Sequence, residues 1–152
     1  MARKNAVSGG RALRAALRKL PIDIKDGVTQ AIAQAGAAVF TDALAAAPGP
    51  EHPYATGELK RKLRLMISRN GLQARVGSWG KRRARHIHLV EFGAAPHDIR
   101  MPDGGVIHHP GAPAQPFLFP AYRRHRAHSV KLIRAAVNEA LSRAAARQGG
   151  RS

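Results

Sequence analysis

The chain contains no cysteine, which excludes disulfide bonds, thiolate nucleophiles and zinc sites built on cysteine. It also lacks any apolar run near the roughly 20 residues that a membrane-spanning helix requires. Basic residues interrupt the first 20 positions throughout, so the apolar stretch of a signal peptide is missing there. From these absences we expect a protein that is made in the cytoplasm and has no membrane partner.

Aromatic and acidic residues are scarce. Aromatics make up 5% of the chain. There are 9 acidic residues against 26 lysines and arginines, which gives a formal net charge of +17. So few aromatic rings argue against the base-stacking surface of a single-strand binder. The positive charge indicates a polyanionic neighbour, such as nucleic acid contacted through its phosphates. A basic surface that is merely solvated is the alternative.

The spacing of apolar residues predicts three helices. Apolar side chains every three or four residues mark a short basic helix over 11–20. The same spacing marks a long helix from Pro21 to Ala47, which Pro48-Gly49-Pro50 ends. A last long helix begins near Pro116 and carries apolar residues to Leu141.

Two strands and a short helix are predicted between the long helices. Alternating apolar residues over 63–67 and 72–76 favour antiparallel strands. Asn70-Gly71 between them predicts a type I′ turn, in which both central residues need positive φ. The segment 86–93 favours a short helix that ends at its last glycine. Residues 94–115 form a long, turn-rich loop that could contain a small hairpin.

Together these elements predict an α+β fold, with a small antiparallel sheet flanked by a long N-terminal helix and a long C-terminal helix. A chain of 152 residues is long enough for one domain with one core. We therefore assign a flexible basic arm to residues 1–10, a single domain to 11–147 and a flexible tail to 148–152.

The eight histidines do not form a recognisable metal site. His86 and His88 would share one face of a strand, and His125 and His128 lie three residues apart on a helix, but few acids lie nearby in the sequence and no HExxH pattern occurs. Phosphate-binding loops and nucleophile elbows are also missing. We therefore predict no catalytic residue, no cofactor and no metal. The best enzymatic alternative is a magnesium-dependent nuclease that would rely on Glu91 or Asp98.

Three short segments stand out by their order and separation. They are Ala47-Pro48 with Thr56-Gly57-Glu58-Leu59, then His88-Leu89-Val90-Glu91-Phe92-Gly93, then His109-Pro110-Gly111 with Gln115-Pro116-Phe117-Leu118 and Pro120-Ala121. In this arrangement, with a long helix on either side, the chain resembles the head-tail joining or tail-completion proteins of long-tailed siphophages over residues 13–141. It departs from that family at Ala94, where threonine is common, and at Phe119, where arginine is common.

The resemblance implies a structural virion protein of the neck, and not an enzyme. Such a subunit would form a homo-oligomeric ring of sixfold symmetry that joins the tail to the head connector around the DNA channel. Its partners would be the head connector or stopper, the tail terminator or tail tube proteins, and packaged DNA held without sequence preference. It would lie in the host cytoplasm before assembly and in the virion afterwards. The main alternative is a free-standing basic nucleic-acid-binding protein.

We expect the family-motif residues to act at turns, in the core or at interfaces. Gly57 would turn the chain into the first strand, and Leu59 would begin the sheet core. Phe92 and Phe117 would be large apolar anchors. Glu91 would form a bidentate pair with an arginine, within or between subunits, or else would have an ordinary core or turn role inside one subunit. The full set is Gly57, Leu59, His88, Glu91, Phe92, Gly93, Pro116, Phe117 and Pro120.

A closed ring needs one contact that repeats from subunit to subunit. We expect the long loop over 94–115 and the basic arms to provide that contact. Arginines in the predicted strands and in the loop after them would line the DNA channel and offset phosphate repulsion without reading sequence. These are Arg64, Arg75, Arg82, Arg83 and Arg85.

Overall fold

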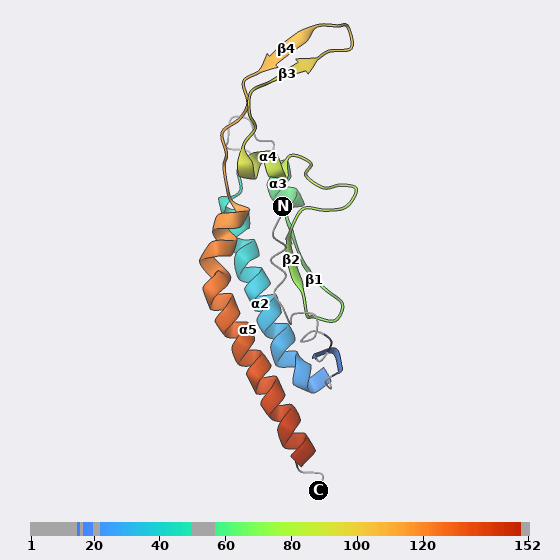
Figure 1. The fold of residues 1–152 in the computed structure, drawn as a ribbon, viewed down its shortest axis with the longest axis vertical. Coiled ribbons are helices and arrows are strands. Elements are labelled where there is room, and N and C mark those ends of the chain that lie inside the picture. The colour runs from blue at the N-terminus through green and yellow to red at the C-terminus, as the bar shows by residue number, and fades with distance from the viewer. Residues whose placement is uncertain (1–14, 16, 20–21, 50–56, 150–152) are drawn as a thin grey trace, which may run out of the picture. The chain divides into compact units, whose positions relative to one another are not determined.

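The computed structural model describes residues 15, 17–19, 22–49 and 57–149 (Figure 1). Its helices are α2 (Ile22–Ala46), α3 (Glu58–Lys62), α4 (Ile87–Phe92) and α5 (Leu118–Gly149). Strands β1 (Arg64–Ile67) and β2 (Ala74–Gly77) form one small antiparallel sheet, and β3 (His97–Arg100) and β4 (Val106–His109) form another. The predicted α+β fold, with long helices flanking small antiparallel strands, is confirmed.

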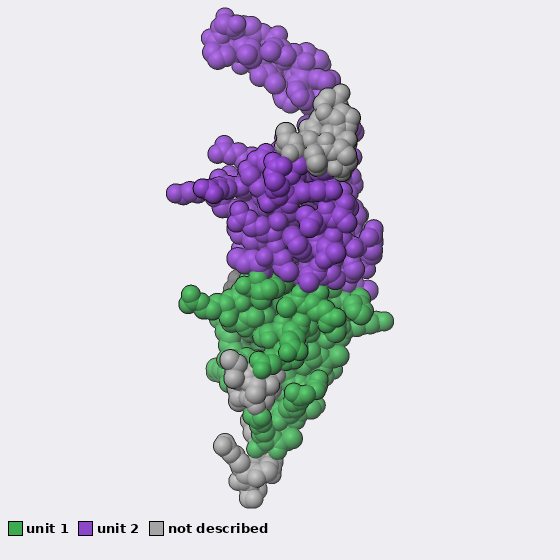
Figure 2. All heavy atoms as spheres, turned by 180° about the vertical axis from the view of Figure 1, so that it is seen from behind, with its two compact units in different colours: residues 1–35, 67–74, 128–152 green, residues 36–66, 75–127 purple. Residues whose placement is uncertain are grey.

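The described residues fall into two compact units, coloured separately in Figure 2. Unit 1 takes its described residues from 15–35, 67–74 and 128–149, and unit 2 takes 36–49, 57–66 and 75–127. Helix α5 continues to Gly149, beyond residue 147 where we placed the end of the domain. No helix in the described part of the chain is long and apolar enough to cross a bilayer.

Unit 1 is organised around a small apolar cluster. Leu17 comes from the predicted basic helix, and its neighbours Arg18 and Lys19 are exposed, as an amphipathic helix requires. The remainder of that helix, the arm at 1–10 and the last residues of the tail at 150–152 lie outside the described residues. The buried members of the cluster are Leu17, Val28, Leu72 and Ala140.

Helix α2 ends where the sequence predicts. The Ala47 N–H donates to the Ala43 carbonyl oxygen at 2.9 Å, but Pro48 has no amide hydrogen with which to continue the ladder. The predicted apolar face is also confirmed, since Val28 is buried in unit 1 and Ala43 in unit 2.

The turn between β1 and β2 forms at the predicted place but is not of type I′. Gly71 has a positive φ of 69°, whereas Asn70 does not, and the Gly71 N–H donates to the Ser68 carbonyl at 2.8 Å. The Asn70 side chain holds the turn instead, because its Oδ1 accepts the Leu72 N–H at 3.1 Å. A Cβ on Gly71 would collide with the methyl group of Thr29, so the glycine also permits close packing within unit 1.

Residues 58–62 form helix α3, which the sequence analysis did not predict. Gly57 is its N-cap in the left-handed conformation, with φ 69° and ψ 4°. Glu58 and Lys62 form an ion pair across its single turn. Gly57 therefore turns the chain into a helix, and the expectation that it leads into a strand is wrong. Leu59 is buried among residues of the helices and loops of unit 2, so its expected place in a sheet core is also wrong.

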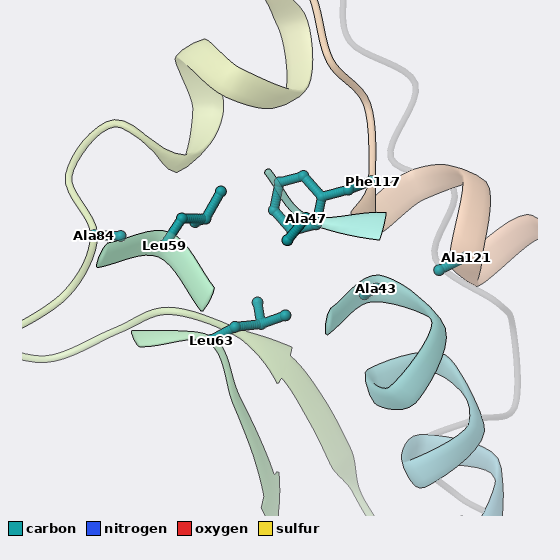
Figure 3. Packing of buried hydrophobic residues seen from close by; sticks show 7 residues of the cluster. All are labelled: Ala43, Ala47, Leu59, Leu63, Ala84, Phe117 and Ala121. Atoms are coloured by element: carbon teal, nitrogen blue, oxygen red, sulfur yellow. The ribbon is translucent and has the colours of Figure 1, made fainter. Parts of the chain in front are cut away.

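The core of unit 2 is built around Phe117, whose exposure is 0%. Leu59 and Leu63 point toward its ring from α3 and the residue after it (Figure 3). Phe117 is thus the large buried anchor that the sequence predicts. The buried members of this core are Ala43, Ala47, Leu59, Leu63, Ala84, Phe117 and Ala121.

Strands β3 and β4 form a hairpin inside the long segment 94–115, as the sequence analysis allowed. They pair antiparallel, from His97 with His109 to Arg100 with Val106. All strand residues are exposed except His109, which is half-buried. The hairpin therefore offers both of its faces to solvent.

Candidate functional site

The segments that carry the family resemblance converge in unit 2. Leu59 and Phe117 meet in its core, while α4 is hydrogen-bonded to the chain just before and at the start of α5. Residues far apart in the sequence thereby reach one region, the junction of α4 and α5.

Glu91 is the buried charged side chain of this junction, at 5% exposure. Its Oε2 accepts the backbone N–H groups of Phe117 and Leu118, and its Oε1 accepts that of Phe119, all at 2.9 Å. The N–H groups at the start of a helix have no partner inside that helix. A carboxylate there also faces the positive end of the helix dipole. Glu91 is therefore a cap for α5 that comes from another helix, 26 residues before the first donor.

Of the two roles expected for Glu91, service inside one subunit is the one observed. Among the described residues no arginine pairs with it, and both of its oxygens accept backbone N–H groups. Asp98, the other acid of the nuclease alternative, lies on exposed β3 and hydrogen-bonds His108 at 2.8 Å. Within the described ranges, no group of three histidine, aspartate or glutamate side chains is placed to hold a metal ion.

Backbone hydrogen bonds fasten the chain after the hairpin to α4 and to the segment that directly follows α4. Ala94 and Ala112 exchange two bonds of 2.9 Å, and the Gln115 N–H donates to the Val90 carbonyl at 2.7 Å. Gly93, which ends α4 as predicted, has φ 77° and ψ 177°, a region open essentially to glycine. A Cβ on Gly93 would lie 2.9 Å from the Ala112 carbonyl oxygen. Glycine is therefore required here for both conformation and space.

The substitution Gly93→Ala is expected to lower the free energy of unfolding by about 3 kcal/mol, through backbone strain and the collision with residue 112. Gly104→Ala is the matched control, because Gly104 also has positive φ (87°) but meets nothing within 4 Å. We expect it to cost only about 1 kcal/mol. Urea denaturation measures both, and equal losses would contradict a role for close approach at Gly93.

Phe92, expected as a buried anchor, is 67% exposed, and that expectation is wrong. Helix α4 has only six residues and turns Glu91 inward, so the next side chain points outward. The ring centroids of Phe92 and Phe119 lie 5.7 Å apart at an interplanar angle of 50°. Leu89 and Tyr122 are exposed one turn away on α4 and α5. We call Leu89, Phe92, Phe119 and Tyr122 the apolar patch.

The remaining motif residues lie around this junction. His88 on α4 and Pro116 before α5 are exposed, and Pro120 is half-buried in the first turn of α5. Proline is tolerated in a first helical turn, because the N–H that it lacks would have no partner there. The interface role that we expect for these three residues stays a prediction.

Pairing across the hairpin sorts its side chains onto two faces, because directly opposed residues point to the same side of a sheet. One face carries His97, Ile99, Ile107 and His109, and the other carries Asp98, Arg100, Val106 and His108. The rings of His97 and His109 stack with centroids 5.0 Å apart. The first face, with its paired isoleucines between two stacked histidine rings, is therefore the more apolar of the two, and the second is mostly polar.

All the arginines expected to line a DNA channel are exposed. The Arg75 guanidinium lies over the Trp79 ring, 5.7 Å from its centroid, in a cation–π arrangement. The loop after β2 is held by buried Ala84, whose N–H donates to the Ser78 Oγ at 2.8 Å. Exposure suits contact with phosphates, and the place of these side chains in a channel stays a prediction. They are Arg64, Arg75, Arg82, Arg83 and Arg85.

Two polar features of the structure have no signal in the sequence that predicted them. In unit 2, the Asp42 Oδ2 accepts a hydrogen bond from Arg124 at 2.7 Å and lies 2.8 Å from the His125 Nε2. No sequence pattern links these residues, because 82 and 83 positions separate the aspartate from its partners. In unit 1, an open hollow of about 490 Å³ is lined by Arg18, Ser68, Arg69, Asn70, Leu72 and Gln73.

Asp42 makes the stability of unit 2 depend on pH. Hydrogen bonding to His125, and then to Arg124, lowers the pKa of Asp42 below its ordinary value of 3.8. A carboxyl group with a lower pKa in the folded state stabilises the fold above its unfolded pKa and loses that contribution as the pH falls through the folded value. We expect Asp42→Asn to destabilise the protein at neutral pH and to have progressively less effect below pH 3.8. Urea titrations across this range measure the difference in the free energy of unfolding between the wild type and Asp42→Asn, and this difference should shrink in acid. A difference that stays constant with pH would contradict the lowered pKa of Asp42.

No family model, curated protein or solved structure matches this chain. The site is therefore defined by its own geometry: a capped helix junction, an apolar patch beside it, an amphipathic hairpin and exposed arginines. This arrangement provides apolar and cationic surfaces on which another molecule can bind.

Proposed function

We propose that the chain is a structural virion protein at the head-tail junction of a long-tailed phage. Copies of it form a ring that joins the tail to the head connector around the DNA channel. The observation that carries this proposal is the apolar patch, in which Phe92 and Phe119 contact each other although Phe92 is 67% and Phe119 is 45% exposed. Contiguous exposed apolar side chains mark contact sites for other macromolecules. Leu89 and Phe92 of the patch belong to one of the segments that resemble the head-tail joining family, whereas Phe119 is a position at which the chain departs from it.

The charge of the chain supports the same proposal. DNA that passes through a protein channel presents a dense row of phosphates, which cationic side chains neutralise without reading bases. A formal charge of +17 and exposed arginines on β1, β2 and the following loop suit this task.

Assembly of the purified protein tests the proposal. Light scattering and native mass spectrometry over a range of concentrations are expected to show discrete oligomers that become more populated as the concentration rises. Negative-stain images should show closed rings, and mass spectrometry of mature particles of the encoding virus should detect the chain. Absence from those particles, or turnover of a soluble substrate by the protein, would overturn the proposal.

A free-standing nucleic-acid-binding protein is the second candidate, and the charge favours it. The two are separated by titrating DNA against the protein at several salt concentrations. A free-standing binder should bind tightly as a monomer, with an affinity that falls steeply with salt in proportion to the phosphates contacted. A channel subunit should bind only weakly as a monomer and should assemble without DNA or on a phage partner.

A further inference from the structure

The β3–β4 hairpin combines an apolar face with acidic charge in an otherwise basic chain. Ile99 and Ile107 are paired on that face and exposed. Met101, whose N–H donates to the Gly105 carbonyl across the turn, continues the same face and is also exposed. Residues 97–109 contain two aspartates and one arginine, so the hairpin has no net positive charge while its histidines are neutral.

The apolar patch on α4 and α5 has the complementary properties. Its four large side chains are exposed, and two of them are phenylalanine rings in contact. Arg123 and Arg126 are exposed beside it, each four residues along α5 from a member of the patch. Among the described residues neither arginine has a carboxylate partner. Residues 118–134 hold five basic residues and no acid.

Both surfaces are exposed in the same molecule, and both belong to unit 2. Neither covers the other within one copy, so both are available for a contact between two copies. Because the surfaces differ, such a contact is heterologous: each copy uses its hairpin toward one neighbour and its patch toward the other. A heterologous contact closes into a ring when its rotation divides the circle.

We infer that the apolar face of the hairpin of one copy docks on the apolar patch of the next copy, with Asp103 in the turn of the hairpin close to Arg123 and Arg126. This inference rests on the proposed ring function. Burial of isoleucines against phenylalanines supplies the affinity, because large apolar and aromatic side chains dominate interface energies. The opposed charges at the edge of the contact select this partner and this orientation.

Two variants that each remove one side of the contact test the inference. The hairpin variant carries Ile99→Asp and Ile107→Asp, and the patch variant carries Phe92→Asp and Phe119→Asp. Each is expected to remain monomeric alone at concentrations where the wild type assembles. Mixed in equal amounts, they should form a one-to-one dimer and nothing larger, because each variant retains the surface that the other lacks. Native mass spectrometry resolves these species.

Val130→Asp is the matched control, since Val130 is exposed on α5 but belongs to neither surface. It should assemble like the wild type. If the wild type assembles and both variants do so equally well, docking through the hairpin is wrong while the ring proposal stands. If the wild type stays monomeric alone and with phage partners, both are wrong. If the hairpin variant still self-associates, its apolar patch binds the same patch of a second copy. The contact would then be two-fold, and the head-to-tail contact proposed above would be wrong.

Charge reversal gives a second test that leaves the apolar residues intact. Asp103→Lys, or Arg123→Glu with Arg126→Glu, should weaken assembly by about tenfold or more. Combining all three substitutions in one chain should restore it, because opposite charges again face each other. A combined variant that assembles more weakly than either of these variants would overturn the proposed juxtaposition. Circular dichroism confirms that each variant is folded.

Discussion

Replacing Phe117 by alanine is expected to lower the free energy of unfolding by about 4 kcal/mol, which is the usual cost of emptying a buried phenylalanine site. The ring is fully buried, and four of its partners in the core are alanines, which cannot extend into the space that it leaves. The loss combines the transfer of the ring to water with the cavity that remains. Urea denaturation followed by circular dichroism measures it.

Phe119→Ala is the matched control for Phe117→Ala. It removes the same side chain two residues away, from a position that is 45% exposed. We expect it to cost less than about 1 kcal/mol, since most of the lost contact is with Phe92 on the surface. Equal effects of the two substitutions would show that Phe117 is not the centre of the core.

Replacing Glu91 by alanine is expected to cost about 3 kcal/mol, because three backbone N–H groups lose a charged acceptor in a poorly hydrated place. Glu91→Gln should cost about half as much. Its amide keeps one oxygen acceptor, while its NH₂ group would face donors. Thermal and urea unfolding of both variants give the ranking Ala, Gln, wild type in order of increasing stability.

Glu139→Ala is the control for removing an acid from the same fold. Glu139 is exposed on α5 and, within the part of the chain that the structure describes, pairs only with Arg143 one turn away, so its loss should cost less than about 0.5 kcal/mol. If Glu91→Ala were no worse than Glu139→Ala, the capping role of Glu91 would be untenable.

Local patterns in the sequence were enough to predict much of the fold. Pro48 marks the end of α2, and Gly93 marks the end of α4, because each residue type acts on the backbone at its own position. The Asn70-Gly71 pair correctly places the first hairpin. Its turn type was predicted wrongly, since the side chain of Asn70 provides an acceptor that a rule on φ angles does not consider.

What the sequence did not predict depends on contacts between distant residues. Helix α3 is a single turn, too short for any apolar period to reveal it. Phe92 was expected to be buried because it is large and apolar, but its neighbour Glu91 takes the inward position to cap α5. A cap supplied 26 residues before the helix that it serves leaves no signature in a local pattern.

The candidate site was predicted only in part. The motif segments were recognised one by one, and their meeting at the junction of α4 and α5 became visible in three dimensions. Likewise, Arg123 and Arg126 were not singled out in the sequence, because nothing there places them beside an apolar patch. The pairing of Ile99 with Ile107 requires the register of the hairpin, which the sequence left open.

The hydrogen bonds that fasten Ala112 to Ala94 and Gln115 to Val90 have a geometric consequence. They fix the direction in which the hairpin leaves α4, the helix that carries half of the apolar patch. In an assembly in which the hairpin of each copy docks on the apolar patch of the next, that direction determines how many copies close the ring. Inserting one residue between α4 and β3 would then change the number of copies, although each docking contact would stay intact.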